Sequence, residues 1–104
     1  MNRASKNKAI LMDNFVPSEF YLSQNYPNPF KDKTSIKYCL PEMTKVELTL
    51  FNSKGEKVKE LLSKFQKEGT YEIILNSQDL QAGVYHYQLK ASNFNATKKM
   101  ALIK

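Results

Sequence analysis

The sequence predicts an all-β fold, a β-sandwich of about seven antiparallel strands with Greek-key connections. Three observations support this prediction. Apolar and polar residues alternate in several short segments, which is the period-two pattern of half-buried strands. Turn residues separate these segments at spacings of about 8–12 residues. The aromatic residues are six Tyr and six Phe with no Trp, and Tyr and Phe favour strands.

The N-terminal residues 1–19 are largely polar and show no clear period. Such a segment is typical of a disordered leader or linker. We therefore expect ordered structure to begin near Phe20. A chain of 104 residues fits a single domain, which we assign to residues 20–104.

Residues 25–30 read Asn-Tyr-Pro-Asn-Pro-Phe. Proline has no N–H group to donate, so this stretch cannot be a helix interior or a central strand. The residue before each proline is also restricted to an extended conformation. The motif predicts a rigid extended loop, with Tyr26 and Phe30 as anchors.

Four segments alternate cleanly and are predicted to be strands with one buried face. A turn at residues 52–55 follows the second of them, where Gly55 can adopt a positive φ. The segments and their apolar faces are 34–40 (Ile36, Tyr38, Leu40), 45–51 (Val46, Leu48, Leu50), 69–75 (Tyr71, Ile73, Leu75) and 84–91 (Tyr85, Tyr87, Leu89).

Residues 56–68 allow two interpretations. Val58, Leu61, Leu62 and Phe65 fall at i, i+3, i+4 and i+7, the spacing of an amphipathic helix. The Glu, Lys and Leu content of the segment also favours a helix. The alternative is a pair of strands with a bend.

The last segment, residues 97–103, is predicted to be the final strand. Met100 and Leu102 lie on one face, and Ala101 and Ile103 on the other. A strand with apolar residues on both faces is typical of a central position or of a strand covered on both sides.

The residues needed for most catalytic and metal sites are missing. Cys39 is the single cysteine and His86 the single histidine, so the chain can form neither an internal disulfide nor a zinc site of the usual Cys/His type. The single histidine gives no indication of a nucleophile–base–acid triad. The three glycines form no phosphate-binding glycine loop motif. We expect no enzyme activity, no metal and no cofactor.

The chain is basic, with 16 Lys and Arg against 10 Asp and Glu and a formal net charge of +6. The basic residues are scattered, and no nucleic-acid-binding motif accompanies them. No apolar run approaches the roughly 20 residues of a membrane-spanning helix. We therefore expect neither nucleic-acid binding nor direct membrane insertion. No signal peptide is recognisable, so an export signal would lie elsewhere in a larger parent protein.

The chain from Phe20 to Lys104 resembles the C-terminal sorting domains of type IX (Por) secretion substrates. The resemblance follows collinear motifs through most of the chain and departs from the family pattern in two loops, at Lys31-Asp32 and Asn76-Ser77. The matching motif residues are Asn25, Tyr26, Pro27, Asn28, Pro29, Phe30, Thr34, Ile36, Tyr38, Gly55, Gly83, Val84, Tyr85, Lys98, Lys99, Met100, Leu102, Ile103 and Lys104.

The resemblance implies an immunoglobulin-like β-sandwich at the end of an exported protein, and strands with a bend at residues 56–68. It also implies a route: the parent crosses into the periplasm, the outer-membrane translocon reads the domain, and a sortase removes it. The cut would fall in or before residues 1–19. The expected location is the cell surface or the medium, and we expect a monomer.

The C-terminal strand is the expected recognition element, because a terminal strand can be read by strand addition. Lys98, Lys99 and Lys104 would supply charge, and Met100, Leu102 and Ile103 apolar contacts. The other motif residues are expected to be structural. These are Asn25, Tyr26, Pro27, Asn28, Pro29, Phe30, Gly55, Gly83, Val84 and Tyr85.

Two alternative functions remain open. A carbohydrate-binding or adhesive module of a secreted enzyme would need exposed aromatic residues, whereas Tyr85 and Tyr87 alternate into the predicted core. An immunoglobulin-like assembly domain, like that of flagellar hook-capping proteins, shares the Gly-Val-Tyr motif. A sorting domain ends its polypeptide, and here the pattern runs to Lys104, which favours sorting.

Overall fold

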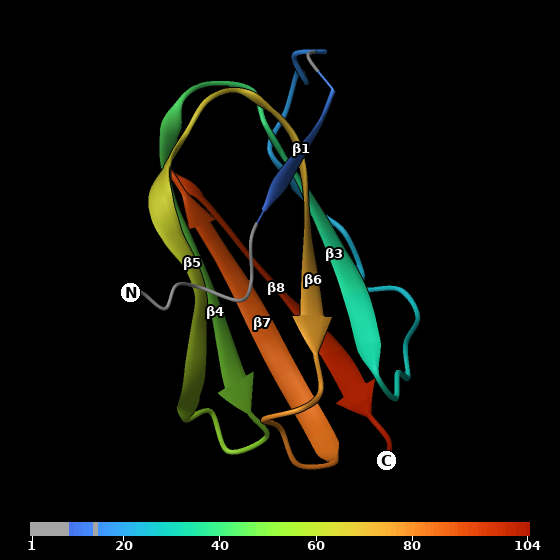
Figure 1. Ribbon diagram of the computed structural model, residues 1–104. Coiled ribbons are helices and arrows are strands. Elements are labelled where there is room, and N and C mark those ends of the chain that lie inside the picture. The colour runs from blue at the N-terminus through green and yellow to red at the C-terminus, as the bar shows by residue number, and fades with distance from the viewer. Residues whose placement is uncertain (1–8, 14) are drawn as a thin grey trace, which may run out of the picture.

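The computed structural model describes residues 9–13 and 15–104, and within these ranges the chain forms strands but no helix. The strands are β1 (Ile10–Asp13), β2 (Tyr21–Leu22), β3 (Lys33–Leu40), β4 (Thr44–Asn52), β5 (Lys57–Gln66), β6 (Gly69–Asn76), β7 (Gly83–Ala91) and β8 (Phe94–Leu102). They form two four-stranded antiparallel sheets, in the orders β1-β6-β3-β2 and β5-β4-β7-β8 (Figure 1). The prediction of an all-β sandwich is confirmed, while its Greek-key connections remain a prediction.

The core lies between the two sheets and is built from the alternating residues that the sequence indicated. Every second side chain of β3, β4, β6 and β7 is buried, because successive side chains of a strand point to opposite faces. Each fully buried Leu or Ile side chain contributes about 1.5–3 kcal/mol to the hydrophobic stabilisation. The predicted faces are all buried, from Ile36, Tyr38 and Leu40 through Val46, Leu48, Leu50, Tyr71, Ile73 and Leu75 to Tyr85, Tyr87 and Leu89.

Residues 57–66 form one strand, so the helical interpretation of this segment is wrong, and the expected pair of bent strands is a single irregular one. Leu62 pairs with Leu48 and Glu60 with Thr49, which leaves Leu61 as an extra residue in a β-bulge. The bulge shifts the alternation by one residue, so Leu61 and Leu62 are both buried. This shift explains the adjacent pair in the helix-like spacing, whereas its other two members, Val58 and Phe65, are exposed.

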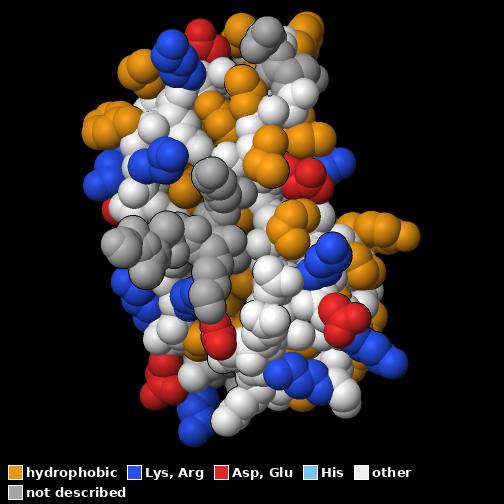
Figure 2. Space-filling view, in the orientation of Figure 1, with side chains coloured by type: hydrophobic (Ala, Val, Ile, Leu, Met, Phe, Trp, Pro, Cys, Tyr) orange, Lys and Arg blue, Asp and Glu red, His pale blue; other side chains and the backbone are white. Residues whose placement is uncertain are grey.

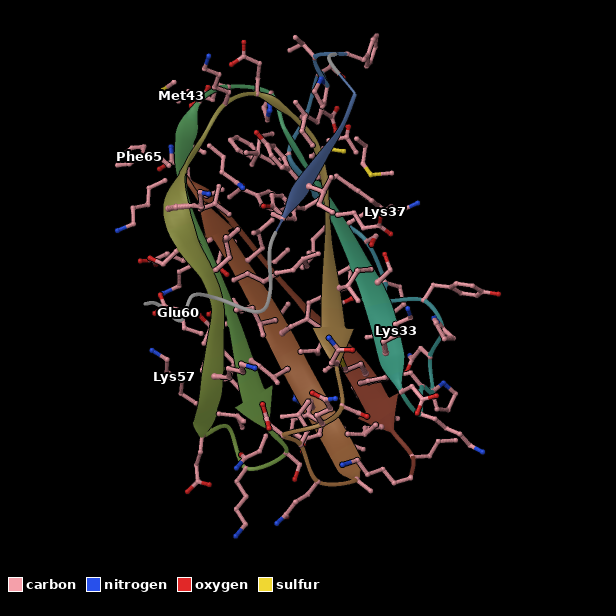
Figure 3. All side chains as sticks on the ribbon, in the orientation of Figure 1. Lys33, Lys37, Met43, Lys57, Glu60 and Phe65 are labelled. Atoms are coloured by element: carbon pink, nitrogen blue, oxygen red, sulfur yellow. The ribbon has the colours of Figure 1, made fainter. Side chains whose placement is uncertain are left out.

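Phe65 confirms that the segment has no helical face. Its side chain is 70% exposed and points away from the sandwich in Figure 3. In an amphipathic helix, Phe65 would share the buried face with Leu61.

Ordered structure begins earlier than Phe20. Ile10–Asp13 forms β1, which pairs with β6 at the edge of its sheet. Main-chain hydrogen bonds hold this strand, while Ile10, Leu11 and Met12 remain exposed. Because such a strand buries little, it leaves no alternating signature in the sequence. Residues 1–8 and 14 of the expected leader lie outside the described residues.

The final strand, β8, is the outer strand of its sheet and pairs along its length with β7 alone. Of the two expected positions, a central strand is therefore wrong, which leaves the alternative of a strand covered on both sides. Met100 and Leu102 are buried, Ala101 is half-buried, and Ile103 lies beyond the end of the strand and is exposed. The apolar outer side of this segment is explained by a loop that covers part of it.

Candidate functional site: the C-terminal strand and the proline loop

The structure divides the six expected recognition residues between core and surface. Met100 and Leu102 are 1% and 2% exposed and belong to the core. Lys98 is half-buried, whereas Lys99, Ile103 and Lys104 are exposed. Direct contact with a partner is thus open to the lysines and Ile103, while Met100 and Leu102 hold the strand in place.

Residues 24–30, here called the proline loop, are organised by a buried asparagine. Asn25 is 2% exposed, and its Nδ2 donates to the Pro27 carbonyl (3.1 Å) and to Thr34 Oγ1 (2.9 Å). Thr34 Oγ1 donates in turn to the Pro27 carbonyl at 2.8 Å, and Gln24 Nε2 donates to Asn25 Oδ1 at 2.8 Å. The peptide bonds before Pro27 and Pro29 are both cis.

The expected anchors of this loop behave differently from each other. Phe30 is buried in the core, as expected of an anchor, but Tyr26 is 79% exposed. The prediction that the Tyr26 side chain anchors the loop is wrong, because main-chain hydrogen bonds of Tyr26, and not burial of its ring, hold this part of the loop. The N–H groups of Tyr26 and Ser35 donate to each other's carbonyl oxygens, both at 2.9 Å. Asn25 supplies the polar anchor from the same motif.

The proline loop closes the C-terminal half of the β8 edge. Phe30 N–H donates to the Ala101 carbonyl at 3.0 Å, and Ile103 N–H donates to the Phe30 carbonyl at 2.9 Å. Two side chains complete the contact. Ala101 N–H donates to Asn28 Oδ1 at 2.9 Å, and Gln24 Nε2 donates to the Lys99 carbonyl at 2.7 Å.

The chain around the loop also binds the edge of the other sheet. Ser23 N–H donates to the Lys37 carbonyl at 2.8 Å, and Lys37 N–H donates to Ser23 Oγ at 2.9 Å. Figure 1 shows this segment running beside β3. Residues 23–30 therefore connect β3 of one sheet to β8 of the other and close this side of the sandwich.

The C-terminus itself is tied to the core. Lys104 Nζ donates a hydrogen bond to the Leu80 carbonyl, and Leu80 is buried. Beside it, a shallow hollow is lined by Pro27, Pro29, Phe30 and Ile103. Lys31, Asp32 and Lys33 also border the hollow, so charged and apolar groups meet at this end of the molecule.

The remaining motif residues lie in a turn, at the start of a strand or in the core. Gly55 has φ +85° in the turn after β4, where Asn52 Oδ1 accepts from the N–H groups of Lys54 (2.9 Å) and Glu56 (3.0 Å). Gly83 and Val84 begin β7. The Tyr85 ring is buried, and its hydroxyl donates to the Gln81 carbonyl.

The buried tyrosines form no aromatic platform for a carbohydrate. Tyr85 and Tyr87 are 7% and 0% exposed. The Tyr87 hydroxyl donates to the Ser23 carbonyl at 2.7 Å, which links β7 to the segment before the proline loop. Burial raises the pKa of the Tyr87 phenol, so the group stays neutral.

The charges and donor groups of the described residues offer no second type of site. Lysine side chains are spread over the face in Figure 2 rather than gathered in one block. Among residues 9–13 and 15–104 no group of three or more His, Cys, Asp or Glu side chains lies close enough to hold a metal ion. The same residues contain no helix that is long and apolar enough to cross a membrane.

Comparison with known proteins identifies the family. Residues 24–104 match the family described as the secretion system C-terminal sorting domain, and this match spans the proline loop and the strands from β3 to β8. Searches of curated proteins and of solved structures gave no match. The resemblance seen in the motifs is thereby confirmed, and the chain belongs to the family of C-terminal sorting domains of type IX secretion.

Proposed function

We propose that the outer-membrane translocon of the type IX system reads this domain as a folded surface, and that a sortase then removes the domain from its parent protein. The observation that carries the proposal is the family match over residues 24–104. In this scheme the parent passes through the periplasm and ends on the cell surface or in the medium. The domain acts as a monomer, without catalysis or a cofactor.

The proposed contact surface is the exposed part of the C-terminal end, formed by Lys98, Lys99, Ile103 and Lys104. Ile103 is 47% exposed beside the apolar hollow of the proline loop. An apolar centre with lysines around it resembles a small protein interface, in which a buried core supplies affinity and the rim is charged. The proline loop supports this surface by fixing the main chain of residues 99–103.

The surface can be tested by replacing Ile103 with aspartate in the full chain, fused behind a signal peptide and a fluorescent passenger in a type IX host. We expect surface display of the passenger to fall about tenfold, because an uncompensated carboxylate in an apolar contact costs at least roughly 1.4 kcal/mol. Whole-cell fluorescence before and after external protease measures display.

The matched control is Val58→Asp on β5, because Val58 is exposed to a similar degree, 41%. This variant should export like the wild type. Equal export of the Ile103→Asp and wild-type chains, both folded by circular dichroism, would contradict the proposed surface. Passenger held in the periplasm with the wild-type tail would contradict the sorting role itself.

Removal by a sortase is tested by the N-terminus of the released tail. We propose a cut in or before residues 1–19. Within this range, Phe15, Val16, Ser18 and Glu19 are exposed between β1 and β2. Mass spectrometry of the released fragment should find its first residue at or before position 20. A first residue after position 20 would refute the proposed cleavage.

A further inference from the structure

The outer edge of β8 has two halves with different surroundings. In the C-terminal half, the proline loop bonds the Lys99 carbonyl, both main-chain groups of Ala101 and the Ile103 N–H. In the N-terminal half, Asn95 and Thr97 are exposed. Within residues 9–13 and 15–104, no main-chain hydrogen bond reaches the outward groups of Asn95 and Thr97.

The direction of these groups follows from the pairing of β8. In an antiparallel pair, the N–H and C=O groups of alternate residues point toward the partner strand and those between them point away. Lys99 and Ala101 bond outward to the proline loop. Thr97 and Asn95 are two and four residues before Lys99, so their main-chain groups point outward as well.

The other outer strand of this sheet offers a poorer edge. The β4–β5 pairing contains two register shifts, and bulges twist an edge away from regular pairing. β8 pairs with β7 in an unbroken register from Phe94 to Leu102. A regular edge with unpaired main-chain groups is suited to the addition of a strand.

Lys98 restricts which strand can be added. It shares the inner face of β8 with Met100 and Ala96, is half-buried, and lies opposite the fully buried Tyr87. A lysine directed inward on an edge strand discourages pairing with an ordinary apolar strand. Within the described residues Lys98 forms no ion pair, and β8 contains two lysines and no acidic residue.

We propose that Phe94–Lys99 takes up an extended segment of the export machinery as a fifth strand of its sheet, with a carboxylate of that segment facing Lys98. The proline loop ends the added strand at Lys99, because it already occupies the edge beyond. This inference rests on the proposed function. It adds how the partner would bind, by strand addition, and which charge its segment would carry.

A proline at position 97 tests strand addition. Thr97→Pro removes an outward N–H that β7 does not use, and proline is tolerated at such edge positions. Residue 96 is already extended, as a residue before proline must be. Thr97→Val is the matched control, because it keeps the N–H and the β-branched shape while losing the hydroxyl. Both are made in the full chain fused to the passenger.

We expect Thr97→Pro to weaken binding to the translocon, solubilised in detergent from type IX outer membranes, by about fivefold or more through the loss of one hydrogen bond. Thr97→Val should bind like the wild type. Equal binding of the two variants, with both folded by circular dichroism, would overturn the inference. A wild-type tail that fails to export its passenger would instead overturn the proposed function.

The charge of the partner is tested at Lys98. Lys98→Glu should lose binding and Lys98→Arg should retain it, since Arg keeps the positive charge. Unchanged binding of Lys98→Glu would contradict the proposal that a carboxylate of the added segment faces Lys98.

Hydrogen exchange on the wild-type chain covers the case in which Thr97→Pro does not fold. We expect the amides of Asn95 and Thr97, which point away from β7, to become protected when the solubilised translocon is added. Binding without protection there would refute strand addition, and protection that grows with the concentration of the chain alone would show pairing of two copies instead.

Discussion

The side chain of Asn25 uses both of its amide hydrogens inside the domain. One hydrogen bond holds the Pro27 carbonyl and the other reaches Thr34, while its own oxygen accepts from Gln24. A buried amide of this kind is stable only because all of its partners are present. Asn25 therefore determines the path of the proline loop from within.

Replacing Asn25 with alanine should lower the free energy of unfolding by about 1–3 kcal/mol, because the Pro27 carbonyl and Thr34 lose a donor in a buried place. Urea unfolding followed by circular dichroism measures the change. Asn76→Ala is the control, since Asn76 is exposed and should change stability by less than about 0.5 kcal/mol. Equal effects at the two positions would disagree with the role of Asn25.

Residue type alone did not reveal which motif side chains are buried. Tyr26 is the larger and more apolar residue of the pair, yet it is exposed while Asn25 is buried. The four hydrogen bonds around Asn25 decide this, and they depend on Thr34 and on the folded path of the loop. Lys104 gives a similar case, because only the folded chain brings its amine to the Leu80 carbonyl.

At the scale of elements, alternation predicts the strands whose two faces differ in environment. β3, β4, β6 and β7 each have a buried and a more exposed face, so their sequences alternate and were predicted correctly. β1 is held by its main chain and lacks this signal. In β5 the bulge at Leu61 interrupts the alternation, and sequence periodicity cannot distinguish such an interruption from a helical repeat.

The bulged strand predicts a large difference between Leu61 and Phe65. Leu61→Ala should lower the free energy of unfolding by about 2–5 kcal/mol, because it leaves a cavity in the core. Phe65→Ala should cost less than about 1 kcal/mol, since the ring is mostly exposed. Thermal and urea unfolding measure both. Similar losses at both positions would contradict the strand geometry.

For the candidate site, the sequence predicts the C-terminal strand as the recognition element, and that remains a prediction, but it gives no information about the edge of the strand. Its six recognition residues include two core side chains, Met100 and Leu102. The pattern of side chains also says nothing about main-chain groups. The closure of residues 99–103 by the proline loop is a contact between segments more than 70 residues apart, which no local pattern contains.

For the whole molecule, the buried phenols predict a loss of stability at high pH. Burial raises the pKa of Tyr38 and of Tyr87 above the ordinary value of about 10. The folded state therefore keeps these protons while the unfolded state releases them. Their contribution is fully present below about pH 10 and decreases as the pH rises above that value.

Urea unfolding between about pH 8 and pH 11 should show this decrease. The decrease should be smaller in Tyr87→Phe, which has no phenol to ionise, and unchanged in Tyr26→Phe, where the ring is exposed. Stability that is constant over this range would show that the buried phenols do not contribute.

The double attachment of the proline loop also bears on biosynthesis. Asn28 is translated 73 residues before Ala101, its partner on β8. A nascent chain that stops before β8 leaves the loop without its four hydrogen bonds to residues 99–103 and the second sheet without its outer strand. Contacts this distant in sequence form late in folding. The finished surface therefore reports that translation has passed through the whole domain, and a prematurely terminated protein would not display it.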